Sequence, residues 1–270
     1  MKRRLWGLKF GLVLVGFFIL LGWTASGWGR PEDTSHLSLR LEAPSFQHPF
    51  GLDEEGRDLL RLVLYGTRLS ISVSFLTVLI SAVFGLAFGL AAGYWGRGWE
   101  KVFVFVTDVI MAFPSILLAI ALAAFYREGG LFSMVLILSV SGWVSYARIA
   151  RGQVMSLREK EYVLAAEGYG AGFFRIGWRH LLPNLLAPLL VNATFGMAGV
   201  ILAESTLSFL GLGIRSDLPS WGRLLDQGIQ YLLVAPHLVI FPGLAIALLI
   251  LGFNFLGDGL RDYFDVKEAR

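Results

Sequence analysis

Residues 148–183 read RIARGQVMSLREKEYVLAAEGYGAGFFRIGWRHLLP, a basic, glycine-rich stretch that interrupts an otherwise strongly apolar chain. Lys and Arg outnumber Glu within it: Arg148, Arg151, Arg158, Lys160, Arg175 and Arg179 stand against Glu159, Glu161 and Glu167. An excess of Lys and Arg beside membrane spans marks the side that faces the cytoplasm. The stretch is therefore expected to be a cytoplasmic insert between two spans.

A short helix is expected in this insert over residues 154–166, because nearly all of these residues favour helix. Its apolar side chains fall roughly on one face, so it should lie flat and not cross the membrane: Val154, Leu157, Ala165 and Tyr169. Three glycines at alternate positions then interrupt the helix: Gly168, Gly170 and Gly172. With Ala165 and Ala166 they leave a surface of small side chains, which lets another backbone approach closely. The insert is interpreted as a docking element.

The composition of the 270 residues excludes an ordinary soluble domain, since 56% are hydrophobic and only 16% charged, with a mean hydropathy of +0.66. An all-α integral membrane protein is expected. The net charge of +3 is small and the basic residues lie beside the apolar runs, so no nucleic-acid partner is implied. The chain has no cysteine, which excludes disulfides, thiolate metal sites and a cysteine nucleophile.

Six apolar segments are long enough to cross about 30 Å of hydrocarbon at about 1.5 Å per helical residue. They are residues 10–29, 69–96, 102–126, 129–147, 181–214 and 231–257. Basic residues precede the first segment and are enriched in the short inner connections, so both termini are expected in the cytoplasm. A cleaved signal peptide is the alternative for the first segment, but its apolar run is longer than a usual signal core.

The two long outer connections are each expected to carry an amphipathic helix that forms an extracytoplasmic rim. In the first, four acidic residues precede an apolar pattern, and acids at a helix start offset its dipole: Asp53, Glu54, Glu55 and Asp58. In the second, Ser220 is placed to cap a helix beginning at Trp221. Candidate rim residues are Asp53, Arg57, Asp58, Trp221 and Arg223. A calcium loop is the alternative for the acids, but the required ligand spacing is absent.

Two acids fall inside predicted spans, where an ionisable side chain must face protein or water because exposure to lipid is costly. Asp108 is placed near the inner boundary, where an ion pair with Lys101 or Arg148 is one interpretation. Glu204 lies toward the outer half of the fifth span and serves either helix packing or the translocation path. The candidate path residues are Glu204, Asn192, Thr194 and Asp108.

Small residues recur at every fourth position of the second span, at Gly85, Gly89 and Gly93. This spacing predicts close packing against another helix. Prolines fall within three other spans, at Pro114, Pro188 and Pro242, and each is expected to bend its helix because proline removes a backbone hydrogen bond.

No catalytic constellation can be assembled from the sequence. Asp108 and Asp258 do not fit an intramembrane aspartyl protease, because Gly257-Asp258 lacks the earlier glycine of the G-x-G-D pattern. The four histidines have no metal-ligand spacing, so no metal site is expected. The chain has no G-x-x-x-x-G-K-[ST] loop for a nucleotide. Any ATP hydrolysis would have to be supplied by another subunit.

The pattern Ala165-Ala166, Gly170 and Leu182-Pro183 resembles the loop motif of inner-membrane permease subunits of binding-protein-dependent ABC importers. Leu164 replaces the glutamate that leads this motif, and Glu161 and Glu167 flank it. The stretch from His48 to Asp58, residues 208–213 and 219–222 and residues 256–262 resemble the dipeptide, oligopeptide and nickel branch of these permeases.

This resemblance implies a type I ABC importer permease fold with six transmembrane helices and a cytoplasmic coupling helix between spans 4 and 5. The implied ATPase-coupling residues are Glu161, Leu164, Ala165, Ala166, Glu167 and Gly170. Residues 69–259 would form the importer transmembrane domain, preceded by the first span and outer loop (1–68) and followed by a cytoplasmic tail (260–270). The implied setting is the inner membrane of a prokaryote, in contact with lipid.

The resemblance also implies four partners: a homologous permease, two ATPase subunits and an extracytoplasmic solute-binding protein. ATP and Mg²⁺ would bind to the ATPases, and this chain would bind no cofactor. Di- or oligopeptides are the expected substrate class, with nickel complexes and oligosaccharides as alternatives. A stand-alone secondary transporter would show mid-membrane charge pairs or inverted repeats, and an ion channel a polar filter; neither pattern is evident in the sequence.

Overall fold

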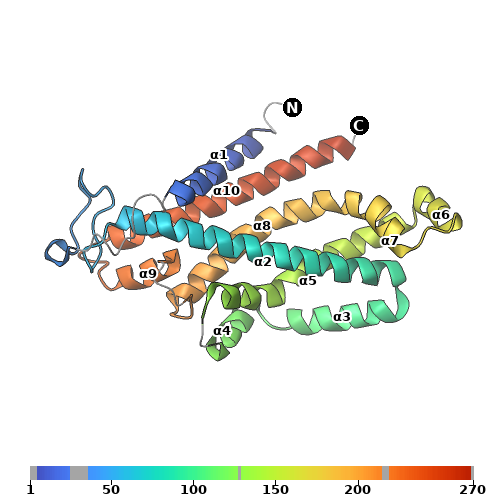
Figure 1. Ribbon diagram of the computed structural model, residues 1–270, viewed down its shortest axis with the longest axis horizontal. Coiled ribbons are helices and arrows are strands. Elements are labelled where there is room, and N and C mark those ends of the chain that lie inside the picture. The colour runs from blue at the N-terminus through green and yellow to red at the C-terminus, as the bar shows by residue number, and fades with distance from the viewer. Residues whose placement is uncertain (1–4, 25–35, 127–128, 215–218, 269–270) are drawn as a thin grey trace.

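The computed structural model describes residues 5–24, 36–126, 129–214 and 219–268. These residues form helices joined by loops, with one isolated bridge between Leu52 and Asp58 (Figure 1). The long helices are α1 (Leu5–Thr24), α2 (Leu59–Trp95), α3 (Arg97–Met111), α5 (Leu131–Arg158), α8 (Leu182–Phe209) and α10 (His237–Glu268). The shorter ones are α4 (Ser115–Phe125), α6 (Glu161–Gly168), α7 (Phe173–Ile176) and α9 (Trp221–Ile229).

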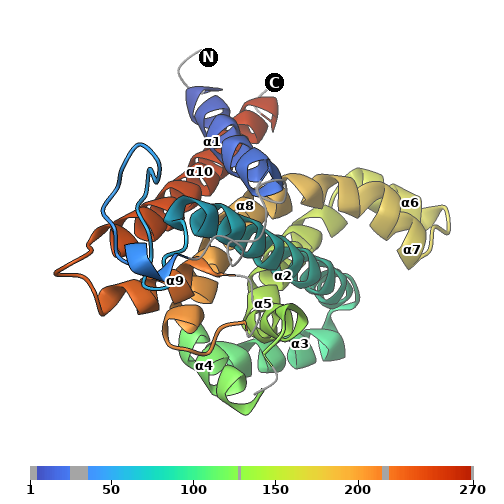
Figure 2. The same ribbon diagram turned by 60° about the vertical axis from the view of Figure 1, so that its left-hand side comes forward.

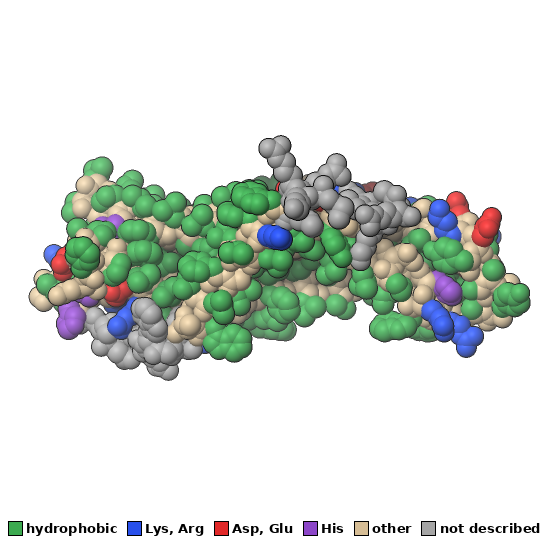
Figure 3. Space-filling view, turned by 90° about the horizontal axis from the view of Figure 1, so that it is seen from above, with side chains coloured by type: hydrophobic (Ala, Val, Ile, Leu, Met, Phe, Trp, Pro, Cys, Tyr) green, Lys and Arg blue, Asp and Glu red, His purple; other side chains and the backbone are tan. Residues whose placement is uncertain are grey.

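The predicted all-α membrane architecture is confirmed. Five helical segments of the described chain are long and apolar enough to cross a membrane, and the α3–α4 pair makes a sixth if it counts as one span. Residues 25–29 of the first predicted span, the start of the outer loop at 30–35 and the basic residues 2–4 lie outside the described residues. Hydrophobic side chains cover most of the middle of the molecule, and most visible charged side chains lie toward its two ends (Figure 3).

The third span, expected over residues 102–126 with a bend at Pro114, is more sharply divided than a bent helix. It is broken into α3 and α4, which are bent by 80° relative to each other. The break falls at Pro114. Its backbone nitrogen carries no hydrogen, so it donates no helix hydrogen bond, and its ring disfavours helical backbone angles at the preceding residue, Phe113. Because α3 has 15 residues, it is about 22 Å long and does not cross the hydrocarbon alone.

The second span is longer than expected, because the predicted outer amphipathic helix and the span form one continuous helix, α2. With 37 residues it is about 55 Å long, so it extends well beyond the hydrocarbon. Its first turn is capped by Asp58, whose side chain accepts a hydrogen bond from the Arg61 backbone N–H at 3.2 Å. The last residue of the acidic cluster, Asp58, therefore caps the N-terminus of α2.

Close packing of α2 on α5 confirms the interpretation of its glycine row. A Cβ atom at Gly85 would lie 2.5 Å from the Trp143 carbonyl oxygen, and one at Gly93 would lie 2.9 Å from Val154 Cβ. One at Gly89 would collide with the Ala147 carbonyl oxygen. The two helices approach so closely only because these positions carry no side chain.

The first and last helices run antiparallel, side by side (Figure 1). A Cβ at Gly11 would lie 2.5 Å from the Leu256 backbone nitrogen, and one at Gly259 would lie 2.5 Å from Leu8 Cα. The described ends of the chain therefore lie on the same side of the molecule.

The predicted inner and outer segments gather at opposite ends of the body. The loop of residues 36–58 and α9 lie at one end, and α6 and α7 lie at the other (Figure 1). In a turned view, the α6–α7 segment projects away from the bundle (Figure 2).

The helix expected over residues 154–166 has different bounds. Helix α5 continues from the membrane to Arg158, the backbone becomes extended at Lys160, and α6 begins at Glu161. The physical reason is that Val154 and Val163 are both fully buried in one hydrophobic cluster. A straight helix would separate these two side chains, whereas the break folds α6 back so that both are covered.

Candidate docking and translocation sites

Helix α6 is anchored to the body by one buried side chain. Val163 is fully buried among Val154 of α5, Ile176 of α7 and Leu185 of α8. The remaining residues of α6 are half-buried or exposed, so α6 presents most of its surface outward. Val163 therefore joins α6 to the hydrophobic cluster that α5, α7 and α8 share.

Gly170 ends α6 in a conformation that favours glycine. Its φ is +82°, and the N–H groups of Gly170 and Ala171 donate to the carbonyls of Glu167 (2.9 Å) and Ala166 (3.0 Å). These are the two bonds of a Schellman motif, in which a left-handed residue closes the helix. No other atom lies within 4 Å of a Cβ built at Gly170, so the turn faces open space.

The predicted coupling residues lie together on this projecting segment. Glu161, Leu164 and Ala165 are exposed, whereas Ala166 and Glu167 are half-buried. Four exposed aromatic side chains accompany them: Tyr162, Tyr169 (93% exposed), Phe174 (86%) and Trp178 (77%). Of these, only Tyr169 was noticed in the sequence, as part of the apolar face of the expected helix. We call these four aromatics and Leu164 the α6 patch. The density of aromatic residues between 162 and 178 was the signal in the sequence that could have identified it.

Aromatic stacking and one arginine hold the base of this segment. Phe173 of α7 stacks on Trp95 at the end of α2, with ring centroids 4.5 Å apart. Arg158, at the end of α5, donates to the Tyr94 carbonyl at 2.6 Å and lies over the Tyr94 ring. The segment is thus joined to the ends of both helices that form the closely packed pair.

Two ion pairs connect α3 to α5. Arg148 contacts Asp108 at 2.7 Å, and Arg151 pairs with Glu100. Of the two partners considered for Asp108 in the sequence, Arg148 is the observed one. The carboxylate of Asp108 therefore has a counter-charge on the neighbouring helix, which accounts for an acid within an apolar segment.

The Asp108–Arg148 pair can be tested by charge reversal. Arg148→Glu should lower the stability of the purified permease because two carboxylates then face each other. Adding Asp108→Arg should restore it, with a coupling free energy of about 0.5–1 kcal/mol. Thermal unfolding in detergent measures the cycle, with Lys101→Glu as a control in α3. Strictly additive single effects would contradict the pair.

Glu204 is fully buried between helices. Its carboxylate accepts hydrogen bonds from Ser208 at 2.7 Å and from Ser70 of α2 at 3.3 Å. Thr194 is also buried, and it lies against Gly257 of α10. Of the two roles considered for Glu204, the geometry matches helix packing, because its oxygens join α8 to α2.

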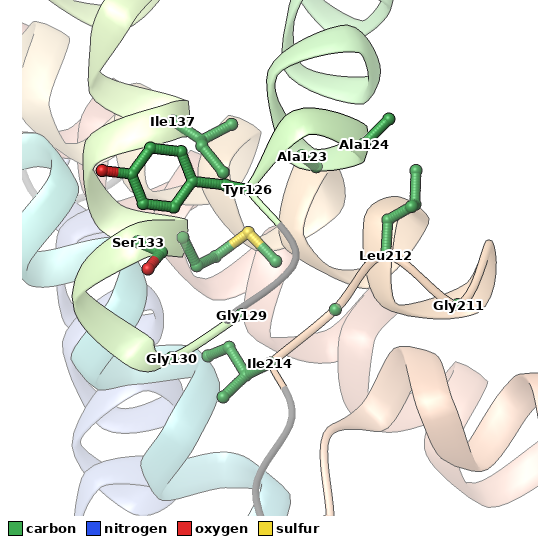
Figure 4. Close-up of a pocket in the computed structure, with 12 residues that line it drawn as sticks. Ala123, Ala124, Tyr126, Gly129, Gly130, Ser133, Ile137, Gly211, Leu212 and Ile214 are labelled. Carbon is green, nitrogen blue, oxygen red and sulfur yellow. The ribbon is translucent and has the colours of Figure 1, made fainter.

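Asn192 is the predicted path residue that lines a cavity. Its Oδ1 accepts a hydrogen bond from Ser145 of α5 at 3.2 Å. Both residues border a cavity of about 310 Å³ among α2, α4, α5 and α8. A separate cavity of about 330 Å³ lies where α4 ends and α5 begins, and Figure 4 shows Tyr126, Ser133 and Leu212 around it.

The predicted rim residues stabilise the outer loop from within. The Asp53 carboxylate accepts from the backbone N–H and the Nε of Arg57, both at 2.7 Å, and Asp58 also contacts His48 at 2.9 Å. Trp221 is fully buried and donates to the Val63 carbonyl at 2.8 Å. The prediction that Asp53, Asp58 and Trp221 belong to an exposed rim is therefore wrong, because all three side chains are buried. Arg223 is exposed.

The acidic outer loop offers no open metal cage within the described residues. No group of three or more His, Cys, Asp or Glu side chains there is arranged to hold a metal ion. Asp53 accepts from Arg57, and Asp58 is used by the α2 cap and His48, so their oxygens already have donors.

Comparison with known proteins shows which protein family this sequence matches. Residues 85–269 match the family described as binding-protein-dependent transport system inner membrane component. The chain is 40% identical over 262 residues to the dipeptide transport system permease protein DppC of Alkalihalophilus pseudofirmus, covering 95% of this chain and 84% of that protein. It is 34% identical over 258 residues to the oligopeptide transport system permease protein OppC of Bacillus subtilis, covering 95% and 84%.

A solved structure shares the fold. A chain of the MetNI methionine ABC transporter in an inward-facing conformation superposes with a TM-score of 0.59 at 19% sequence identity. The match covers 73% of this chain and 93% of that one.

Proposed function

This chain belongs to the family of binding-protein-dependent transport system inner membrane components, and from that premise we propose that it is the permease subunit of an ATP-driven importer of di- or oligopeptides. The names of the similar permeases support peptides as the substrate class. The observation that carries the proposed coupling role is the α6 patch, a group of large apolar side chains exposed at one end of the body.

The α6 patch is the proposed docking surface for a separate ATPase subunit. Exposed aromatic side chains clustered on a projecting segment are typical of a protein interface. A second ATPase would dock on a homologous permease that pairs with this chain. ATP and Mg²⁺ bind to those ATPases, and this chain contributes no catalytic residue.

Coupling follows from how α6 is attached. Movement of α6 on closure of the ATPases would act through Val163 on α5 and α8, and α5 packs along α2 with little room to yield. A closely packed bundle responds to such a force by shifting helices as units between discrete arrangements. The bundle would thereby alternate between inward-open and outward-open states.

The proposed orientation places α6 and both termini in the cytoplasm of a prokaryote, with the loop of residues 36–58 and α9 outside the inner membrane. Lys and Arg enrichment around α6 supports this orientation. The extracytoplasmic solute-binding protein would then meet the outer end. Arg223 and the exposed part of the loop remain the proposed contact surface.

Uptake by the reconstituted complex tests the substrate and the energy source together. The permease, its partner permease and both ATPases are placed in liposomes, with the solute-binding protein on the outer side. We expect labelled dipeptide to accumulate only with ATP and the binding protein present. Preferential uptake of a nickel complex or an oligosaccharide would mean that this compound, and not a peptide, is the substrate. Uptake by the purified permease alone, without ATPases, would instead indicate a secondary transporter.

A further inference from the structure

The cavity that Asn192 borders is lined by apolar residues and by a smaller set of uncharged polar side chains. Its hydroxyl and amide side chains come from four helices: Ser81, Ser115, Ser141, Ser145, Tyr146 and Asn192. No Asp, Glu, Lys, Arg or His side chain belongs to the described lining. Asn192 lies near the middle of the candidate membrane span Phe173–Phe209, so the cavity is far from both ends of that span.

Two of these hydroxyls are buried and have no hydrogen-bond partner within the described chain. They are Ser81 Oγ on α2 and the Tyr146 hydroxyl on α5, in residues that are 0% and 3% exposed. A buried polar group without a partner is unfavourable, and native proteins rarely leave one unpaired. Both residues line the cavity. Their missing partner is therefore expected to be a molecule that occupies it.

Two glycines keep these hydroxyls clear of neighbouring side chains. A Cβ at Gly142 would lie 2.7 Å from Ser81 Oγ, and one at Gly196 would collide with the Tyr146 hydroxyl. Gly142 and Gly196 also line the cavity. On its open side the cavity is bordered by exposed residues, including Ser115 and Gly199, so a solute can enter the cavity from there.

We propose that this cavity is a transit site for the substrate's peptide backbone, an assignment that rests on the proposed import of peptides. Every peptide unit carries a donor N–H and an acceptor C=O whatever its side chain. Hydroxyl groups can donate and accept, so Ser81 and Tyr146 pair with either. Because the described lining carries no charged side chain, it favours neither cationic nor anionic side chains of the peptide. The site therefore recognises backbone and is indifferent to side-chain charge.

The test removes the two hydroxyls while conserving shape, using the complete reconstituted transporter. Ser81→Ala with Tyr146→Phe is compared with Ser74→Ala, a buried hydroxyl on α2 that bonds to its own helix at the Ile71 carbonyl (3.0 Å). Uptake of neutral, cationic and anionic dipeptides is measured at saturating binding protein. The double variant should slow all three by the same factor, about tenfold, and the control should stay within about twofold. Unchanged uptake, or a loss that depends on peptide charge, would overturn the assignment.

A labelling experiment keeps the proposal testable if the double variant does not assemble. The chain has no cysteine, so Ser141→Cys provides a single reactive thiol at the cavity and Gly16→Cys one on α1 as a control. Dipeptides of any charge should slow maleimide labelling of the first severalfold and leave the second unchanged. Equal labelling with and without dipeptide would exclude binding there. If the wild-type complex imports no peptide at all, the proposed function fails; if it imports peptide without these effects, only the cavity assignment fails.

Discussion

Replacement of Gly89 by leucine is expected to abolish accumulation of folded permease. Even a methyl group at this position collides with the Ala147 carbonyl oxygen and would lie 2.9 Å from Ala150 Cβ. Both contacts belong to α5, whose buried face cannot move away without opening the α2–α5 packing. Overpacking a side chain against the backbone on this scale lowers the free energy of unfolding by about 3 kcal/mol or more. A loss of this size is a large fraction of the stability of a folded domain.

The measurement is the yield of monodisperse protein on size-exclusion chromatography, followed by thermal unfolding of what elutes. Gly16→Leu is the matched control, because no atom lies within 4 Å of a Cβ built at Gly16. It should give a wild-type profile, and Gly89→Ala an intermediate one. A normal yield and melting curve for Gly89→Leu would mean that α2 and α5 do not pack as described.

Leu164→Arg is expected to prevent recruitment of the ATPase while leaving the permease folded. Leu164 is 52% exposed within the α6 patch, so the isolated permease should tolerate a charge there. At a docked interface the same charge would be desolvated without a partner, which typically costs a few kcal/mol. We expect at least a tenfold loss of ATPase copurification and of ATP-dependent uptake.

The matched control is Leu39→Arg, at a leucine of similar exposure (45%) at the opposite end of the body. It should retain the ATPase at the wild-type level. Full ATPase copurification with Leu164→Arg would mean that the ATPase does not dock on the α6 patch. A loss with both variants would indicate a general defect in the permease and would not support docking at this helix.

Membrane insertion and the small-residue contacts were predictable because they depend on local properties. Each span follows from the length and apolarity of one continuous segment. The close approach of α2 to its neighbour follows from the repeat of Gly85, Gly89 and Gly93 within one helix. The cap at Ser220 was also predictable, and its hydroxyl accepts from the Arg223 N–H at 3.2 Å.

Other features depend on contacts between distant segments. Pro114 predicts a bend, but the 80° angle between α3 and α4 does not follow from a proline alone. The start of α6 was misplaced because residues 154–158 are helical but belong to the end of α5. The burial of Val154 in one cluster with Val163, Ile176 and Leu185 becomes visible only after folding. The rim was misassigned for a similar reason. Acids such as Asp53 appear exposed in sequence, whereas Arg57 and backbone N–H groups enclose that carboxylate.

The amino-acid sequence by itself determined that this protein is a helical membrane protein with a basic insert between two spans, because hydropathy, charge and helix propensity act over neighbouring residues. The tertiary structure alone decided that Tyr162, Tyr169, Phe174 and Trp178 are exposed beside Leu164. It also decided that Glu204 is enclosed and that Ser81 and Tyr146 meet at one cavity. The enclosure of Glu204 and the position of Ser81 and Tyr146 depend on helices far apart in the chain, so no local pattern encodes them.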